Sequence, residues 1–387
     1  MNGRHAWVRR LGPWVGIGTS PAALMTGGGL SVGHDGMAVI VLVLGGTVLL
    51  TVLAVAQGVL GVRERRALGA VVARALPGAA GQRMAALTML AMMVGWFGVN
   101  VDVGGTALAR LLGLPGPAGM ALFGGIALLA TVRGLGALSW TALVTGTATV
   151  VLAGWGLALA AERAPLGFDS ASVQPQVGAL TGLSVVVGYG AAFALRTPDF
   201  TLDLPRSRDV VACGVVGLGL PLIVFAVIGA VLQASTGHWN IADVLTDLQS
   251  PVAGQAFVAV GFLGSVMTNL HSGRLAFATG TGMGSRIGVW AVAAAGLALA
   301  VSGFGGRMIN FMVLLAVVVP GLIVVCVAAA SDRSPARSAW AWIWAASCAV
   351  GLAVEYLPGG GGVLAATGTA VAGAVAVRRS RGRRATA

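Results

Sequence analysis

A tryptophan and an asparagine one helical turn apart are the side chains best suited to chemistry in this sequence. Trp96 and Asn100 lie in the apolar segment 85–109, which is long enough to cross a bilayer. Residues four apart share one face of a helix, so a flat π-surface and an amide project into the same space. An amide both donates and accepts hydrogen bonds, and the pair therefore suits a flat heterocycle with polar edges.

A second polar stripe lies in the apolar segment 253–280. Ser265 precedes Asn269 by four residues and Ser272 follows it by three, so the three side chains share one helix face. Such a stripe in a membrane helix must face protein or a cavity. We expect Asn269 and Ser272 to line a substrate cavity. Hydrogen bonds to a neighbouring helix, or back to the same helix, are the alternative.

The composition indicates a polytopic membrane protein. Of 387 residues, 57% are hydrophobic and 9% are charged, whereas a soluble domain carries roughly 25% charged residues. Spans of about 20 apolar residues are needed to cross a bilayer. The sequence predicts twelve of them, at 11–32, 37–61, 85–109, 116–132, 138–161, 178–198, 209–233, 253–280, 286–303, 308–330, 338–355 and 361–377.

The +12 net charge comes from arginines that gather between the spans. With the N-terminus in the cytoplasm, nineteen of the 24 arginines fall on the cytoplasmic side and three outside. They therefore act as topology signals rather than as a nucleic-acid-binding surface. This distribution predicts a multi-pass protein of the cell membrane with both termini in the cytoplasm.

The residue patterns favour no catalytic or metal site. The three cysteines, Cys213, Cys326 and Cys348, lie in apolar runs without the spacing of metal ligands and are expected to pack. No span contains an HExxH motif or a pair of aspartates at ligand spacing. A membrane-embedded transferase would need such a cluster, so the sequence predicts no enzyme and no resident cofactor.

Two predicted spans carry helix-breaking residues. The first contains Gly16, Gly18 and Pro21, and the sixth contains Gly188, Gly190 and Pro198. Glycine and proline free backbone groups, which a bilayer tolerates only beside a cavity or other protein. Breaks at matching places in two halves predict an inverted-repeat transporter. The freed carbonyls around Gly16 and Thr19 would bind a cation or contact substrate, and a proline kink alone is the alternative there. Close packing of small residues is the alternative interpretation.

Four segments together resemble the nucleobase:cation symporter family, which includes the purine and cytosine permeases. They are GPWVGIGTSPAALMTGG in the first span, GWFGVN in the third, TPDF after the sixth and TNLHSG in the eighth. The resemblance implies an all-α integral membrane fold of the LeuT type. Residues 1–330 would form ten helices in two inverted repeats, about 11–161 and 178–330, and residues 331–387 would add two peripheral helices and a basic cytoplasmic tail.

The resemblance also implies a function. It predicts a secondary active transporter that imports a nucleobase-like or related nitrogenous heterocycle by alternating access, coupled to a cation. Trp96 would stack on the ring, and Asn100 and Asn269 would bind its edge. Substrate would lie between the first, third, sixth and eighth spans. An amino-acid or other organic-solute permease of the same fold is the alternative.

The sequence departs from the family at two places. Gly190 occupies the position of a second stacking aromatic in the sixth span. Tyr189 and Phe193 flank it but are expected to point elsewhere on a regular helix, and an unwound backbone would bring one of them in. Of the hydroxyl groups at the family's sodium site, only Ser265 has a counterpart. Sodium is a hard cation that needs several oxygen ligands, so both Na⁺ and H⁺ remain candidate coupling ions.

Charged residues within the spans have two interpretations each. Asp102 pairs with another span or couples protons. Arg196, near the cytoplasmic end of the sixth span, is expected to snorkel to the interface; an arginine facing the cavity would instead favour an anionic substrate. Arg274 has the same ambiguity, and His271 is expected to be structural. The predicted partners are a small molecule and the bilayer, with the oligomeric state open.

Overall fold

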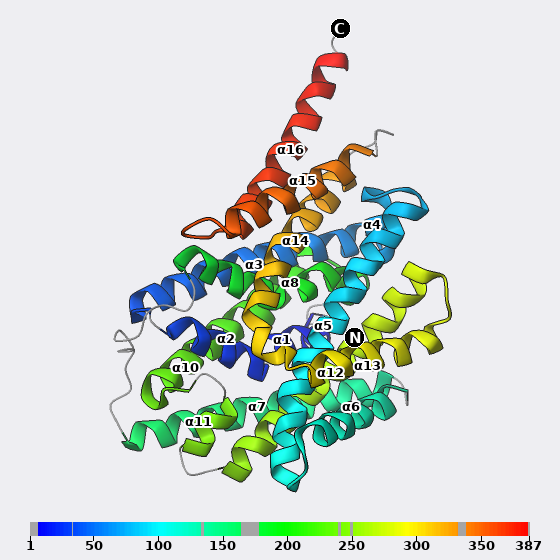
Figure 1. The fold of residues 1–387 in the computed structure, drawn as a ribbon. Coiled ribbons are helices and arrows are strands. Elements are labelled where there is room, and N and C mark those ends of the chain that lie inside the picture. Colours follow the sequence, from blue (N-terminus) through cyan, green and yellow to red (C-terminus); the bar gives the residue numbers. More distant parts are fainter. Residues whose placement is uncertain are drawn as a thin grey trace.

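The computed structural model describes residues 7–32, 34–132, 135–163, 178–238, 241–247, 251–331 and 338–385. Every regular element in these ranges is a helix (Figure 1). The bounds, with short 3-10 and π segments marked η, are η2 Val8–Arg10, α1 Gly12–Gly18, α2 Pro21–Ser31, α3 Gly36–Glu64, α4 Leu68–Ala75, α5 Gly78–Leu112, α6 Gly116–Val132, α7 Leu135–Arg163, α8 Ala179–Thr201, α9 Ser207–Ala212, η3 Cys213–Gly219, α10 Leu220–Thr236, α11 Ile241–Asp247, α12 Pro251–Thr281, α13 Ser285–Val301, η4 Phe304–Arg307, α14 Met308–Ala330, α15 Ser338–Glu355 and α16 Gly362–Ala385.

Helices occur at all twelve predicted spans. Within the described ranges, six stretches are long and apolar enough to cross a membrane by length and composition: α3, α5, α8, the run from α9 to α10, α12, and the run from η4 to α14. Helices α6, α13 and most of α15 are apolar but shorter. The short helices α4 and α11 lie in predicted loops. The number of crossings, the inverted repeat and the division at residue 331 remain predictions.

The first span is broken, as predicted, and Pro21 explains where. Proline has no N–H, so the carbonyl of Ile17 loses its partner four residues on. Helix α1 therefore ends at Gly18, and α2 begins at Pro21 after two non-helical residues. Ser20 caps α2, because its Oγ accepts from the N–H of Ala22 at 3.1 Å.

The sixth span is not broken, and this prediction was wrong. Helix α8 is continuous, and its glycines serve close packing. A Cβ on Gly188 would lie 1.7 Å from the carbonyl oxygen of Met312 in α14. A Cβ on Gly190 would lie 2.4 Å from Leu50 Cδ2 in α3. Small residues here let three helices approach one another.

Pro198 does not break α8 because its neighbour compensates for the missing N–H. The carbonyl that Pro198 leaves without a partner is that of Ala194, four residues earlier. The Thr197 hydroxyl donates to this carbonyl at 2.9 Å and lies equally close to the carbonyl of Ala54 in α3. The same threonine thus supports α8 and joins it to α3.

The helices around the polar residues form two groups. In the first, which we call the bundle, α1, α2, α3, α8 and α10 pack together. A Cβ on Gly27 of α2 would lie 1.8 Å from the carbonyl oxygen of Ala226 in α10. The Thr201 hydroxyl of α8 donates to the carbonyl of Gly58 in α3 at 2.7 Å.

The second group, which we call the scaffold, contains α5, α12 and α13. A Cβ on Gly104 of α5 would lie 3.3 Å from Phe262 Cβ of α12, and a Cβ on Gly273 of α12 would lie 3.2 Å from Met93 Cβ of α5. These contacts make α5 and α12 antiparallel. The alignment places Asn269 close to the level of Phe97, between Trp96 and Asn100 along α5.

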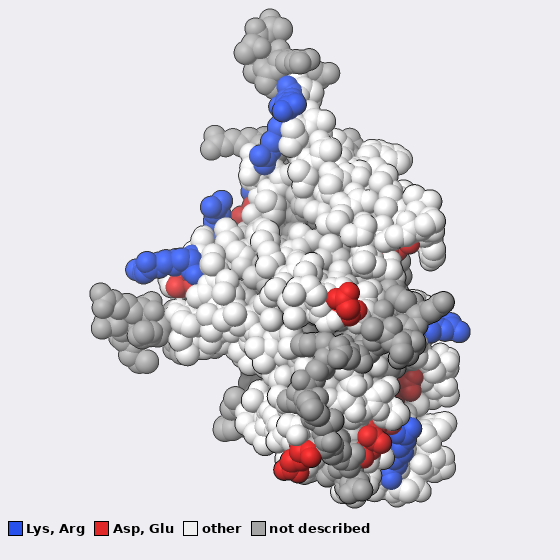
Figure 2. Space-filling model, turned by 90° about the vertical axis from the view of Figure 1, so that its left-hand side faces the viewer, with Lys and Arg blue, Asp and Glu red and all other residues white. Residues whose placement is uncertain are grey.

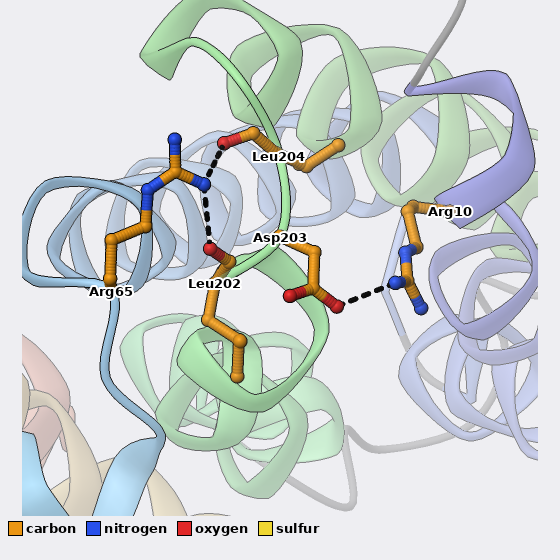
Figure 3. A network of polar contacts seen from close by, with 5 residues as sticks. All are labelled: Arg10, Arg65, Leu202, Asp203 and Leu204. Atoms are coloured by element: carbon orange, nitrogen blue, oxygen red, sulfur yellow. Dashed lines mark hydrogen bonds and ion pairs between the residues drawn. The ribbon is translucent and has the colours of Figure 1, made fainter.

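Side chains fix the segment after α8 to the bundle (Figure 3). Arg65, just after α3, donates to the carbonyls of Leu202 and Leu204, both at 2.9 Å. Arg10, just before α1, pairs with Asp203 at 2.6 Å across an exposed surface. The ends of α8 and α3 and the start of α1 are therefore joined on the arginine-rich side of the molecule.

The last two helices pack against α8 and α14. Glu355, at the end of α15, accepts from the Ser184 hydroxyl of α8 at 2.9 Å and from the N–H of Gly362 at 2.7 Å. Helix α16 then projects beyond the other helices (Figure 1). Blue side chains gather on this projection, whereas most of the visible surface below it is uncharged (Figure 2). The side chains of residues 381–387 lie outside the described part.

Candidate functional site

Trp96 stands in an aromatic cluster between scaffold and bundle. Its ring centroid lies 6.1 Å from that of Tyr189 in α8 and 5.6 Å from that of Phe311 in α14, with both rings edge-on to it. Trp96 is 7% exposed. Its nearest rings therefore meet it at steep angles rather than stacked in parallel.

Tyr189, not Gly190, is the sixth-span residue beside Trp96. The expectation that Tyr189 points elsewhere was wrong, because α8 remains regular and turns Gly190 toward Leu50 of α3. Phe193, one turn after Tyr189, packs edge-on against Trp14 of α1 with centroids 5.1 Å apart. Phe193 thus joins α1 to α8, and no contact between it and Trp96 is seen.

Asn100 and Asn269 are buried without hydrogen-bond partners among the described residues. Asn100 is 3% exposed and its Oδ1 has no donor, while Asn269 is 6% exposed. Interhelical bonding was the alternative role for both, and the described chain supplies no such bond. A buried amide oxygen left unpaired costs about 1–3 kcal/mol. The unpaired Asn100 oxygen, with the buried Asn269 amide at nearly the same level, marks a place for a polar ligand or water.

The two serines of the eighth-span stripe differ. Ser265 is half-buried, and its hydroxyl has no hydrogen bond to another described residue. Ser272, also half-buried, accepts from Nη1 of Arg196 across the gap between α12 and α8. Ser272 therefore lies where scaffold and bundle meet, one turn from Asn269 toward the arginine-rich side.

The break between α1 and α2 is tied to the aromatic cluster. The Tyr189 hydroxyl donates to the carbonyl of Ile17, the group that Pro21 left without its helical partner. Thr19 is 4% exposed and its hydroxyl donates to the carbonyl of Val15 at 2.8 Å. The sixth-span ring that contacts Trp96 thus also holds the first-span break.

The predicted cation residues lie around this break. Gly16 is half-buried in α1, and a Cβ on it would meet no atom within 4 Å. A Cβ on Gly261 of α12 would lie 2.5 Å from Pro21 Cγ, so α12 approaches the break. Ser265 follows Gly261 by one turn on the same face. A cation role for Gly16, Thr19 and Ser265 remains a prediction.

The structure shows the contacts of two buried charged side chains. Asp102 accepts from the N–H of Gly305 in η4 at 2.7 Å, so it contacts the start of the tenth span, and its role in proton coupling stays a prediction. Arg196 does not snorkel: it is 4% exposed, its Nε donates to the carbonyl of Ala192 at 3.3 Å, and Nη1 reaches Ser272. The short distance to α12 directs the side chain inward instead of toward the interface.

Sequence patterns pointed to some of these residues and not to others. Tyr189, Phe193 and Arg196 are spaced four and three apart, so a regular α8 puts all three on one face, a signal that the assumption of a broken helix hid. Phe311 belongs to an apolar run that gives no spacing cue. Its role follows only from the contact between α14 and α5.

No family model and no curated protein matches the sequence. The fold, by contrast, matches solved transporters. The inward-facing conformation of Mhp1 superposes with a TM-score of 0.77 at 18% identity, covering 96% of this chain and 90% of that one. Mhp1, described as a nucleobase-cation-symport-1 family transporter, also matches in a closed conformation with bromovinylhydantoin bound, at the same TM-score and identity and with 96% and 91% covered.

Two further neighbours are transporters of other solutes. A Na⁺-coupled sialic acid symporter in a substrate-bound outward-open state has a TM-score of 0.68 at 12% identity, covering 94% of this chain and 88% of that one. A manganese transporter of Eremococcus coleocola has a TM-score of 0.59 at 12% identity, covering 97% and 94%. Over its described residues the chain therefore has the helical fold of LeuT-type membrane transporters, as its resemblance to nucleobase:cation symporters predicted.

Proposed function

We propose that this protein is a secondary transporter that imports a flat nitrogenous heterocycle, nucleobase-like in its polar edge, across the cell membrane. The observation that carries the proposal is the buried Oδ1 of Asn100, which has no hydrogen-bond partner one helical turn from Trp96, with the buried amide of Asn269 at nearly the same level. Each amide offers a donor and an acceptor. A lactam or aminopyrimidine edge presents the complementary pattern.

The aromatic residues account for the flat part of the ligand. Stacking a base on an aromatic side chain contributes about 1–3 kcal/mol. Tyr189 and Phe311 meet Trp96 edge-on, and they would border the ring and exclude water around it. Bromovinylhydantoin, which is bound in one Mhp1 structure, contains a flat nitrogenous ring. The similarity of the two folds supports this class of ligand but does not identify the solute.

Alternating access would use the two helix groups. Trp96 and Asn269 belong to the scaffold, whereas Tyr189 and the broken first span belong to the bundle. Contacts between the groups include Trp96 with Tyr189 and Arg196 with Ser272. Rocking of the bundle against the scaffold would open and close a site held between them.

We further propose that a cation drives uptake and binds near the α1–α2 break. Pro21 removes the helical donor of the Ile17 carbonyl, which accepts from Tyr189 instead, and the N–H of Ala22, the usual partner of the Gly18 carbonyl, donates to Ser20. Ser265 on α12 would add a hydroxyl. Na⁺ would use these oxygens together, whereas H⁺ would need a titratable group. Replacing sodium with choline at constant pH, and then varying pH in choline, separates the two.

The test is ligand-induced stabilisation of the purified protein together with uptake into proteoliposomes. A ligand that binds the native state at 100 times its dissociation constant raises stability by about 2.7 kcal/mol. Nucleobases, hydantoins and amino acids would be compared for wild type, for Trp96→Ala and for a control, Trp342→Ala. Trp342 is 76% exposed on α15, so its removal tests only the loss of a tryptophan.

We expect a heterocycle to stabilise wild type and Trp342→Ala. Trp96→Ala should bind about 5- to 150-fold more weakly, the range that corresponds to the loss of one stacked ring. Equal binding by Trp96→Ala would remove the site assignment. Stabilisation by amino acids alone would move the function to the organic-solute alternative.

A further inference from the structure

Arg196 carries a buried positive charge that forms no salt bridge within the described residues. It is 4% exposed, and its guanidinium bonds only to the Ala192 carbonyl and the Ser272 hydroxyl among the described residues. The ion pairs of the described chain involve other arginines. The carboxylate of Asp199, one turn later along α8, acts on this charge electrostatically but accepts at 2.7 Å from the N–H of Leu68. A buried guanidinium without a directly paired carboxylate is costly, so it has capacity for an anion.

A second arginine nearby, Arg274, also forms no salt bridge within the described residues. Nε of Arg274 in α12 is buried and has no hydrogen-bond partner among the described residues. Nη2 of Arg274 lies 3.3 Å from Nδ1 of His271. Arg196 reaches Ser272, which follows His271 directly and precedes Arg274 by two residues on α12, so the three basic groups share one region. Ser272 lies within it, and no carboxylate is paired to either arginine in the described structure.

The position of this cluster relates it to the ring site. Arg196 follows Tyr189 by seven residues, which is two turns on the same face and about 10 Å along α8. Ser272 follows Asn269 by one turn, about 4.5 Å along α12. The basic cluster is therefore adjacent to the ring site, on the side of the arginine-rich loops. A ligand with its ring at Trp96 would extend an acidic substituent toward it.

We propose that Arg196, Arg274 and Ser272 form a subsite for the carboxylate of the transported solute, which is then a flat nitrogenous heterocycle bearing an acidic group. This proposal deepens the proposed function and rests on its ring site. Arginine suits the role, because its planar fork binds a carboxylate through two parallel hydrogen bonds. An inorganic anion such as chloride is the alternative ligand of these arginines, because it carries the same negative charge.

The test compares two ligands that share a ring and differ in a carboxylate. Uracil and orotate, which is uracil with a 6-carboxylate, would be titrated into full-length detergent-purified protein in gluconate buffer, and 6-methyluracil would control for bulk. The variants are Arg196→Gln and Arg274→Gln. Arg110→Gln is the matched control, since Arg110 forms an exposed ion pair with Asp243 away from the site.

We expect wild type and Arg110→Gln to bind orotate more tightly than uracil or 6-methyluracil. Arg196→Gln should weaken orotate about tenfold to a hundredfold, the range for a lost charge-assisted hydrogen bond, and change uracil little. Arg274→Gln should weaken orotate in the same direction. Because Arg274 is half-buried, this variant carries the test if Arg196→Gln fails to fold.

Several results would overturn the subsite. One is a wild type that does not prefer orotate; another is an orotate preference that survives in Arg196→Gln, or in Arg274→Gln where that variant carries the test. Chloride that stabilises wild type and displaces orotate would assign the arginines to an inorganic anion. Trp96→Ala separates this inference from the proposed function: orotate binding that needs Arg196 but not Trp96 keeps the subsite and removes the ring site.

Discussion

Asn100 illustrates how a side chain that is placed for a ligand can lower the stability of the ligand-free protein. Its amide oxygen is buried without a donor, which costs about 1–3 kcal/mol. Removing such a group while keeping its volume is neutral or stabilising. Asn100→Leu should therefore leave the melting temperature of the ligand-free protein unchanged or raise it by a few degrees, and should weaken heterocycle binding about tenfold or more.

Thr201→Val is the opposite control for that measurement. The Thr201 hydroxyl donates to the Gly58 carbonyl at 2.7 Å and to the Thr197 carbonyl at 3.0 Å. Valine would leave the Gly58 carbonyl without that donor and lower stability by about 1 kcal/mol, without affecting binding. A thermal scan of both variants, with and without ligand, checks the contrast. A clear loss of ligand-free stability in Asn100→Leu would mean that the amide is structural.

At the residue scale, the sequence was informative where one element supplied the whole pattern. Trp96 with Asn100, and Asn269 with Ser265, are visible because helical spacing is fixed within a segment. The rings around Trp96 come from α8 and α14, and their identity depends on how separate helices pack. No spacing rule within one segment reaches across helices, which is why Tyr189 was misplaced and Phe311 was not found.

At the element scale, glycines decide how closely the helices approach. A Cβ on Gly188 would overlap the Met312 carbonyl oxygen at 1.7 Å, so Gly188→Ala must push α8 away from α14. Overpacking of this kind typically costs 1–3 kcal/mol. We expect Gly188→Ala to lower the thermal stability of the purified protein by at least about 2 kcal/mol and to reduce uptake, because α8 positions Tyr189.

Gly125→Ala provides the matched control within another helix. Gly125 lies in the interior of α6, and a Cβ on it would meet nothing within 4 Å. Alanine there should be neutral or stabilise by about 0.5–1 kcal/mol, because it restricts the unfolded chain. Equal stability of the two variants would mean that the α8–α14 contact is looser than described here.

Hydropathy and Pro21 predicted helices and a break correctly, whereas two glycines led to a wrong prediction. The positions of the spans followed from hydropathy, because bilayer thickness fixes the length of an apolar helix. The break in the first span followed from Pro21, whose missing N–H no neighbouring side chain replaces within the helix. Gly188 and Gly190 were assigned to a second break, since sequence alone does not distinguish a glycine that frees the backbone from one that admits a neighbouring helix.

At the scale of the whole molecule, arginines predict which side faces the cytoplasm. Nineteen of 24 lie on one predicted side of the membrane, and positively charged loops are retained in the cytoplasm. Arg10 and Arg65 hold the segment after α8 on that side, and Arg378 and Arg379 extend it along the projecting α16 (Figures 1 and 2). If the protein were inserted in the opposite orientation, all of these arginines would have to cross the membrane.

Cysteine labelling of intact cells tests this orientation. Tyr356, 85% exposed between α15 and α16, is predicted outside, and the exposed Ser380 near the end of α16 is predicted inside. A membrane-impermeant maleimide should label Tyr356→Cys on intact cells and Ser380→Cys only after permeabilisation. Wild type is the background control, because its three cysteines are free and at most partly exposed. The opposite pattern would invert the protein, and would place the basic subsite beside Arg196 at the outer entrance of the ring site instead of at its exit to the cytoplasm.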